Sequence, residues 1–434
     1  MADRLPGTLR TYRLLSVLAT PFAPLLLARR LSRGKEHRTR MAERRGETST
    51  ARPPGPLVWV HGASVGELAS AVPLIERIRA RGFNLLVTTG TVTSAGVAEQ
   101  RLSRGIIHQF VPLDSPRFVR RFIHHWQPDL ALFVESDLWP NLMMEAASDG
   151  VPLILVNGRL SESSYRRWRH FPRTIANLLE RFDLCLARTP SDGNRYDELG
   201  APRVVTTGNL KLDVPAPPAD AAALAALQKA VQNRPVIAAA STHQGEEAMV
   251  IEAHKRLRER FPDLLTIIAP RHPERGPGIG EIAAAAGVNA ALRSLREKPE
   301  HTTDIYVADT MGELGLVYRL APIVFIGGSL VRHGGQNPIE AAKLGAAILH
   351  GPQVSNFEEI YATLDAANGA EQVNNTDELA RKFEAWLADP TTRAEVAKIA
   401  HTTVEGLGGA LERTMRALDP YLLQLRLGQR ARHA

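Results

Sequence analysis

Cysteine is almost absent from this chain of 434 residues, and its scarcity excludes a disulfide framework. The single thiol, Cys185, lies in the apolar run Leu184–Ala187 and is expected to be buried. One cysteine without a partner fits a reducing compartment. The histidines are scattered without close paired spacing, so the sequence predicts no metal site. We therefore expect a protein that works without a metal or other cofactor.

Several motifs that mark common enzyme classes are also missing. The chain has neither a P-loop signature nor a Gly-x-Ser-x-Gly elbow, which weakens NTPase and serine-hydrolase interpretations. It has no internal repeat of fixed period, no low-complexity tract and no heptad seam. The sequence is therefore typical of a globular protein rather than a solenoid or a coiled coil.

The chain lacks an excess of positive charge outside the N-terminal segment. The formal net charge is +7. Through Pro53 there are 12 basic and four acidic residues, which gives +8 and leaves −1 for the rest of the chain. A nearly neutral body argues against broad nucleic-acid binding, and we expect no nucleic-acid partner.

The N-terminal segment contains one apolar stretch, Leu14–Ala28, with arginines on both sides. It is shorter than the roughly 20 residues that span a bilayer, and it contains Pro21 and Pro24. We favour an interfacial docking element whose arginines face anionic headgroups. The alternatives are a hydrophobic helix packed on the body, a single span, or a cleaved signal peptide. No good small-residue cleavage site supports the last of these.

From Pro53 onward, short apolar runs alternate with helical patterns, which predicts parallel sheets covered on both faces. We expect a docking segment over 1–52, a Rossmann-like domain over 53–212, a proline-rich linker over 213–232, and a second Rossmann-like domain with closing helices over 233–434. The predicted strands are Leu57–Val60, Leu85–Thr89, Ile106–Val111, Leu130–Val134, Leu153–Val156, Leu184–Ala187, Val236–Ala240, Leu264–Ala269, Ile305–Val307, Ile323–Ile326 and Ala347–Leu349.

A glycine-rich loop follows the predicted strand Ile323–Ile326. Asn337 and Pro338 are then typical of the cap and first turn of a helix, with Glu340 in that turn. Such a helix start offers free backbone N–H groups and a positive dipole end, which suit a phosphate. Glu340 would suit sugar hydroxyls. The alternative is an ordinary, well-capped turn.

Ligand sites of doubly wound sheets lie at the carboxyl ends of strands, so the polar residues that follow strands are candidates. Glu67 could act as a general base, or simply as a helix-start acid. Glu135 precedes Trp139 in a segment that could bind polar ligands with apolar faces, or could cap a helix and fill the core. Lys211 could meet a departing phosphate, or be an exposed hinge lysine.

The predicted second domain has three similar segments, Ser241–Glu247, Pro270–Arg275 and Asp309–Leu314. Arg271 in the second of these could bind a phosphate or a base edge with its planar guanidinium. We expect the cleft between the two Rossmann-like domains to be the site.

Eight segments in order resemble the 3-deoxy-D-manno-octulosonic acid (Kdo) transferases of lipopolysaccharide synthesis, over nearly the whole chain. They are Ser64–Glu67, Glu135–Asn141, Asn157–Ser161, Gly208–Lys211, Ser241–His243, Pro270–Arg275, Met311–Leu314 and Gly334–Glu340. The resemblance implies a GT-B fold and an inverting, metal-independent transfer of Kdo. The implied donor is CMP-Kdo, and the implied acceptor is a hydroxyl of a lipid A precursor, lipid IVA. It also implies a place on the cytoplasmic side of the inner membrane.

The resemblance also implies roles for individual residues. Glu67 matches the catalytic base, and Glu135 and Lys211 match residues that stabilise the transition state. Arg159 and Ser161 resemble an acceptor-side motif. The residues that match CMP-binding segments are Pro270, Arg271, Met311, Gly312, Glu313, Asn337, Pro338, Ile339 and Glu340.

Three positions depart from the family pattern. Gln336 replaces the usual histidine, Ser136-Asp137 replaces Thr-Glu, and Thr91–Ser94 replaces Thr-Pro-Thr-Gly. Gln keeps hydrogen-bonding capacity but cannot titrate. The alternatives are a GT-B enzyme for another nucleotide sugar and a non-catalytic, membrane-bound saccharide-binding protein. The combination of Glu67, Glu135 and Lys211 argues against the second.

Overall fold

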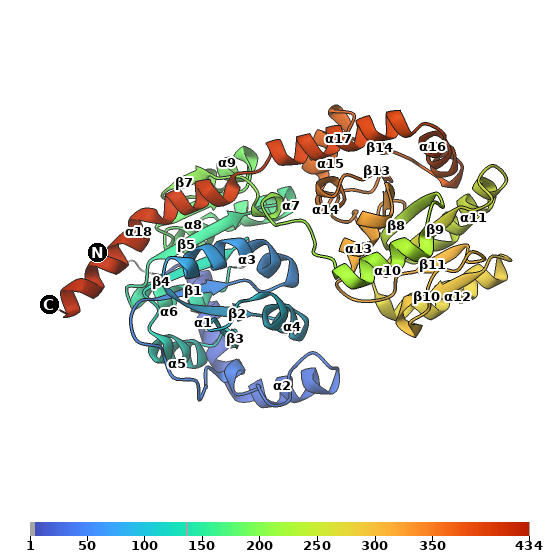
Figure 1. Cartoon of the computed structure of the whole chain (residues 1–434). Helices are drawn as coiled ribbons and strands as arrows, with labels where there is room; N and C mark the ends of the chain where they lie inside the picture. The colour runs from blue at the N-terminus through green and yellow to red at the C-terminus, as the bar shows by residue number, and fades with distance from the viewer. Residues whose placement is uncertain (1–4, 136–137, 434) are drawn as a thin grey trace. The chain divides into compact units, whose positions relative to one another are not determined.

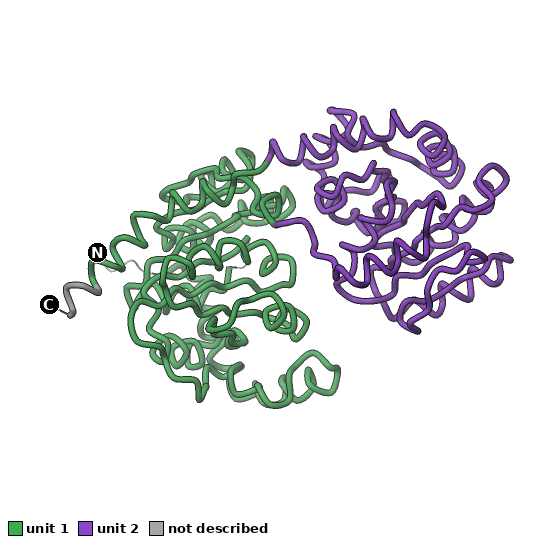
Figure 2. The backbone as a smooth tube through the Cα atoms, viewed as in Figure 1, with its two compact units in different colours: residues 1–214, 408–434 green, residues 215–407 purple. Residues whose placement is uncertain are grey.

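The computed structural model describes residues 5–135 and 138–433, and it divides into two compact units (Figure 2). Unit 1 comprises residues 1–214 and 408–434, and unit 2 comprises residues 215–407. Each unit is built around one parallel sheet of seven strands (Figure 1). The predicted α/β architecture of two Rossmann-like parts is confirmed.

The sheet of unit 1 has the strand order β3-β2-β1-β4-β5-β6-β7, and all its pairs are parallel. Successive residues of a strand point to opposite faces. Leu57 and Trp59 of β1 therefore enter one hydrophobic cluster, and Val58 and Val60 enter another. The strands are β1 (Leu57–His61), β2 (Asn84–Thr89), β3 (Ile107–Phe110), β4 (Leu130–Val134), β5 (Leu153–Gly158), β6 (Leu184–Ala187) and β7 (Val204–Thr206).

Helices cover both faces of this sheet, as the near-continuous apolar strands predict. The helices of unit 1 are α1 (Gly7–Ala19), α2 (Ala23–Ser32), α3 (Val65–Ala80), α4 (Val92–Arg101), α5 (Pro116–Trp126), α6 (Pro140–Ser148), α7 (Glu162–Arg169), α8 (Pro172–Leu179), α9 (Pro190–Glu198) and α18 (Ala410–His433), with short 3-10 turns η1 (Thr20–Phe22), η2 (Glu43–Arg45) and η3 (Leu210–Leu212).

The apolar N-terminal stretch forms α1 and α2, which are separated by η1 around Pro21. Residues 7–32 are long and apolar enough to cross a membrane by length and composition alone, and 11% of the most apolar window is buried. One side of α1 is fixed to the body. Tyr12 donates to Asp114 at 2.8 Å, Arg13 pairs with Glu145 at 2.6 Å, and Leu9 is buried.

The sheet of unit 2 repeats the plan, with the order β10-β11-β9-β8-β12-β13-β14. Its strands are β8 (Val236–Thr242), β9 (Leu265–Pro270), β10 (Ala290–Leu292), β11 (Ile305–Val307), β12 (Ile323–Ile326), β13 (Ala347–His350) and β14 (Ala370–Gln372). Its helices are α10 (Ala221–Val231), α11 (Glu246–Arg258), α12 (Gly276–Ala285), α13 (Leu314–Leu320), α14 (Ile339–Lys343), α15 (Glu358–Ala366), α16 (Thr376–Ala388) and α17 (Pro390–Gly406), with 3-10 turns η4 (Pro273–Arg275) and η5 (Arg293–Leu295).

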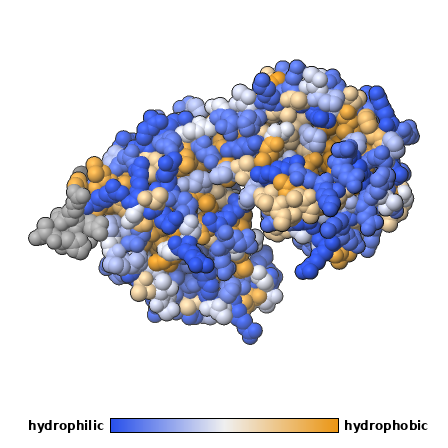
Figure 3. Space-filling view, viewed as in Figure 1, coloured by the Kyte–Doolittle hydropathy of each residue, from blue (hydrophilic) through white to orange (hydrophobic). Residues whose placement is uncertain are grey.

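The closing segment differs from its predicted place in the second domain, since residues 408–434 belong to unit 1. The reason is packing. One hydrophobic cluster joins α18 to Val58 and Val60 of β1 and to the buried face of α3. The residues that α18 contributes are Ala410, Met415, Leu418 and Leu422. Near its end α18 leaves Leu423 and Leu427 exposed, and hydrophobic surface is visible beside the grey C-terminal end (Figure 3).

Candidate active site

The strand order of unit 1 reverses direction between β1 and β4, which pair side by side. Doubly wound sheets bind ligands outside the carboxyl ends of the strands at such a reversal. Glu67 follows β1 and Glu135 follows β4. The two predicted carboxylates therefore come from the two loops that flank the reversal point.

Glu67 lies in the first turn of α3 and forms a capping box with Ser64. Its Oε2 accepts hydrogen bonds from the backbone N–H of Ala63 at 2.7 Å and of Ser64 at 3.3 Å. Reciprocally, Ser64 Oγ accepts from the N–H of Glu67 at 3.3 Å. Glu67 therefore does stabilise the start of α3. The same hydrogen bonds fix its carboxylate at the end of β1. The loop Thr91–Ser94 caps α4 in the same reciprocal way.

Glu135 and Lys211 form an ion pair, with 2.7 Å between Lys211 Nζ and Glu135 Oε1. Glu135 is buried and has a left-handed backbone with φ of 66°. Its N–H donates to Val156 O at 2.9 Å, so the neighbouring strand holds this conformation. Lys211 lies on η3 and keeps part of its side chain exposed. The alternative interpretation, a freely exposed hinge lysine, does not hold, because a buried carboxylate binds the ammonium.

Asn157 begins one of the eight segments named above, but sequence reasoning gave it no role in the site. It is buried at the end of β5, with φ of 55°. Its Oδ1 accepts from Leu210 N at 3.0 Å, which fixes the η3 turn that carries Lys211. A non-glycine residue rarely adopts a left-handed backbone, and asparagine does so most readily. An asparagine directly after an apolar strand was therefore the available signal.

The acceptor-side candidates Arg159 and Ser161 follow β5 in the same loop. The carbonyl of Arg159 accepts from the hydroxyl of Tyr196 at 3.1 Å. Ser161 caps α7 by accepting from Ser164 N at 3.3 Å. Ser136 and Asp137, which depart from the family pattern, lie outside the described residues.

In unit 2, the glycine loop after β12 does not offer free amides over its first residues. The N–H groups of Gly328, Ser329 and Leu330 donate to the carboxylate of Glu246, at 2.7, 3.0 and 3.0 Å. Glu246 is fully buried in the first turn of α11. Buried backbone donors need an acceptor, and this side chain supplies one. These three amides are therefore not available to an anion, and the expected anion position at the later helix start is a separate place in the loop.

The following helix start is close to the predicted one. The helix α14 begins at Ile339, and Asn337 Oδ1 accepts from Ile339 N at 3.0 Å. The buried Pro338 is the N-cap residue, and the side chain of Asn337, one position earlier, binds the first backbone N–H of the helix. The half-buried Glu340 occupies the first turn. With only five residues, α14 offers a weaker dipole than a full helix.

A group of three histidines lies beyond the ends of β8, β9 and β12. His243 stacks on His333 with ring centroids 4.0 Å apart, and the ring centroid of His272 lies 6.1 Å from that of His243. Burial lowers the pKa of His243 to about 4, and electrostatic interaction with His333, His272 and Arg271 acts in the same direction. His243 is therefore neutral at pH 7, and its Nε2 lies 3.1 Å from Nε2 of Gln336. The amide of Gln336 thus donates to a neutral imidazole.

The remaining CMP-site candidates lie on neighbouring loops of unit 2. Pro270 ends β9, and the exposed Arg271 anchors its backbone N–H on Thr242 O at 3.0 Å. Met311 is exposed, and Gly312 has φ of 81°. Glu313 forms a two-pronged ion pair with Arg293 at 2.5 and 2.6 Å, which lowers the pKa of that carboxyl.

The described residues contain no group of three or more His, Cys, Asp or Glu side chains that could hold a metal ion. Known proteins resemble this chain closely. Residues 39–214 match the family model described as 3-deoxy-D-manno-octulosonic-acid transferase (kdotransferase). The chain is 34% identical over 393 residues to the 3-deoxy-D-manno-octulosonic acid transferase of Haemophilus influenzae, which covers 89% of this chain and 92% of the relative.

A second relative, the 3-deoxy-D-manno-octulosonic acid transferase of Bordetella pertussis, is 37% identical over 388 residues. The match covers 86% of this chain and 90% of the relative. Among solved structures, UDP-GlcNAc 2-epimerase from Neisseria meningitidis gives a TM-score of 0.58 at 15% identity, over 85% of this chain and all of the other. That likeness concerns the fold alone, which is of the GT-B class. The relatives span both units, and on their identity this chain belongs to the family of Kdo transferases.

Proposed function

We propose that this enzyme transfers Kdo from CMP-Kdo to a hydroxyl of a lipid A precursor, with inversion at the anomeric carbon. The observation that carries the proposal is the Glu135–Lys211 pair at the end of β4, next to the strand that leads to Glu67. A carboxylate and a fixed cation are the groups that such a transfer requires, because a proton leaves the acceptor while negative charge grows on CMP.

In this proposal Glu67 removes the proton from the acceptor hydroxyl. The capping box supports the assignment, because it holds one carboxylate oxygen against the backbone and so limits the positions of the other. Lys211 opposes the developing negative charge, and Glu135 fixes the ammonium. Arg159 and Ser161 lie on the loop after β5, and we assign them to the acceptor side.

CMP is proposed to bind unit 2, at the ends of β8, β9 and β12. Arg271 is the main phosphate ligand, because its side chain is exposed and no ion pair within the described residues engages it. The backbone of 311–313 and the start of α14, from Asn337 to Glu340, complete the nucleotide site. Glu313 then acts by shaping its loop, because Arg293 and Thr310 already hold its carboxylate.

Arg271→Ala should weaken CMP binding about tenfold, because a charge-assisted hydrogen bond to phosphate is lost. Isothermal calorimetry with CMP measures the change, and Arg381→Ala on the exposed surface of α16 is the control for loss of one arginine. CMP affinity equal to that of the control would remove Arg271 from the nucleotide site.

The N-terminal helices are proposed to dock the enzyme on the cytoplasmic face of the inner membrane. Their outer face exposes Leu14, Leu15, Leu18, Phe22 and Leu25, of which Leu25 is 72% exposed. The inner face of α1 is bonded to the body through Tyr12 and Arg13. This two-sided arrangement supports a helix that lies on the surface rather than one that crosses the bilayer.

Replacing Leu18 and Leu25 with Gln should release the protein from anionic vesicles, because two largely exposed apolar anchors are lost. Co-sedimentation measures the bound fraction. Leu423→Gln with Leu427→Gln provides the matched control, since these two leucines are similarly exposed on α18. Full sedimentation of the Leu18/Leu25 variant would contradict docking through α1 and α2.

The reaction itself is tested with purified protein, CMP-Kdo and lipid A precursor in detergent. Mass spectrometry should detect the acceptor with added Kdo and should report how many units are added. Transfer from a UDP-sugar in the absence of CMP-Kdo would instead indicate a different donor for the same fold.

A further inference from the structure

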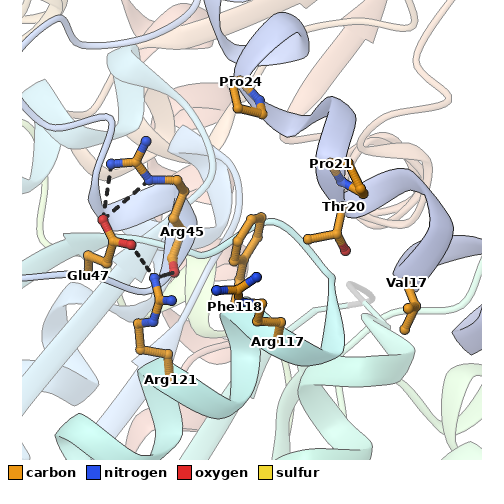
Figure 4. Close-up of a pocket in the computed structure, with 9 residues that line it drawn as sticks. All are labelled: Val17, Thr20, Pro21, Pro24, Arg45, Glu47, Arg117, Phe118 and Arg121. Carbon is orange, nitrogen blue, oxygen red and sulfur yellow. Dashed lines mark hydrogen bonds and ion pairs between the residues drawn. The ribbon is translucent and has the colours of Figure 1, made fainter.

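Two adjoining hollows lie between the N-terminal helices and α5 in unit 1. One has a volume of about 550 Å³ and is lined by Val17, Pro21, Pro24 and Phe118 among others (Figure 4). The other, of about 470 Å³, lies next to Arg13 and His124. Val17, Arg117 and Arg121 line both hollows, so the two form one continuous depression.

The walls of this depression are strongly basic. Glu47 is the one acidic residue among the described residues that line it. The arginines that line it are Arg13, Arg45, Arg117, Arg120 and Arg121. The charge of Glu47 is already shared, because Arg45 lies 3.0 Å from it and Arg121 also pairs with it. Arg13 forms an ion pair with the buried carboxylate of Glu145, with 2.6 Å between nitrogen and oxygen.

Arg117 differs from these neighbours, since no ion pair or hydrogen bond engages its guanidinium within residues 5–135 and 138–433. Figure 4 shows it beside Phe118, apart from the dashed contacts of Glu47. It is exposed in the first turn of α5. An unpaired guanidinium facing an open basic hollow is suited to a bound anion, and its planar fork matches phosphate.

The helices that form the other wall also carry the exposed apolar face. Val17, Pro21 and Pro24 face the hollow, whereas Leu18, Phe22 and Leu25 are exposed beside them, with Phe22 67% and Leu25 72% exposed. Pro21 and Pro24 present no backbone N–H, so this wall is apolar. A ligand here meets arginines on one side and hydrocarbon on the other.

We propose that the depression binds the phosphate of a bilayer phospholipid, with its acyl chains along the exposed face of α1 and α2. The proposal rests on membrane docking by these helices, and it adds a specific headgroup site to that docking. Arg117 and Arg121 contact the phosphate, and Val17 and Pro21 contact the glycerol and upper acyl region. A phospholipid fits better than a free ion because the apolar wall would leave a free phosphate poorly solvated.

The test measures equilibrium binding of the full chain to phosphatidylcholine vesicles with and without phosphatidylglycerol at fixed ionic strength. Arg117→Gln should lose about tenfold in affinity for the phosphatidylglycerol vesicles, because a charge-assisted contact is removed. Arg117→Lys should recover only part of the loss, since an ammonium cannot bind two oxygens at once. Arg101→Gln, exposed in the last turn of α4, is the control for equal charge.

The outcomes separate this site from docking in general. Wild-type protein that binds neither vesicle would refute docking itself, and the headgroup site with it. Binding by wild type with equal affinities for Arg117→Gln and Arg101→Gln would leave docking intact and overturn the headgroup site. Thermal unfolding of Arg117→Gln should match wild type, because the side chain makes no contact that the fold uses.

Two further measurements identify the source of the phosphate. Calorimetry with inorganic phosphate should detect no binding that depends on Arg117. In nonionic detergent without phospholipid, the KM for the lipid acceptor should be the same in wild type and Arg117→Gln. A phosphate affinity removed by the substitution would make this a free-phosphate site, and a raised KM in detergent would assign it to the acceptor. Either result overturns the phospholipid assignment.

Discussion

Glu67→Gln should lower the rate of Kdo transfer about 10²–10⁴-fold, which is the usual cost of losing a general base. Glutamine nearly preserves size and still accepts hydrogen bonds, so the capping box with Ser64 can persist. What disappears is the ability to take a proton. CMP affinity should be unchanged, because the proposed nucleotide ligands belong to unit 2. Steady-state turnover with saturating donor and acceptor, together with calorimetry for CMP, measures both.

A similar helix start in α16 supplies the control. Glu378 lies at the same position of its helix as Glu67, its carboxylate accepts from Asn374 N at 2.9 Å, and its own N–H donates to Asn375 Oδ1 at 2.9 Å. Glu378→Gln therefore makes the same chemical change to another acid in the first turn of a helix. If both variants kept near-normal turnover, Glu67 would be a helix-start acid and nothing more.

Lys211→Met should lower turnover about 10²–10³-fold, the usual cost of losing one preorganised charge at a developing negative centre. The substitution also leaves Glu135 as a buried carboxylate without its cation, which should reduce the free energy of unfolding. Lys211 is partly exposed, so water offsets some of this penalty. Activity and stability must therefore be measured together.

Combining Lys211→Met with Glu135→Gln separates the two effects. The double variant removes both charges, so no unpaired carboxylate remains and thermal stability should partly recover. Turnover should stay low, because the counter-charge to CMP is still missing. Recovery of turnover along with stability would mean that the pair serves the fold and that Lys211 does not oppose the leaving group.

Most strands of both sheets were predictable, because each is a continuous run of apolar residues between helical patterns. The prediction missed three strands, β7, β10 and β14. Each has three residues and lies at the edge of its sheet. Such short edge strands bury little apolar surface, and most of their stabilisation comes from pairing with a neighbour that the sequence does not reveal.

The candidate site was predictable to a similar extent. Sequence pattern selected Glu67, Glu135 and Lys211 as candidates. It did not predict that Glu135 and Lys211 form an ion pair, because the two residues lie 76 positions apart on loops that only the strand order brings together. It also did not predict an acceptor within the protein for the amides of Gly328 and Ser329. Their actual acceptor, Glu246, lies on a different helix far back in the chain, and no local rule connects the two.

The return of α18 to unit 1 has a consequence for the order in which the nascent chain can fold. Unit 2 is contiguous in sequence, so every strand and helix that it needs has been synthesised by Leu407. Unit 1 begins first, yet the hydrophobic cluster on one side of its sheet stays incomplete until Met415, Leu418 and Leu422 have left the ribosome. Domains tend to fold as units during synthesis, and here the unit that starts later is completed earlier. During that interval, the exposed apolar surface beside α3 is where a chaperone would be expected to bind.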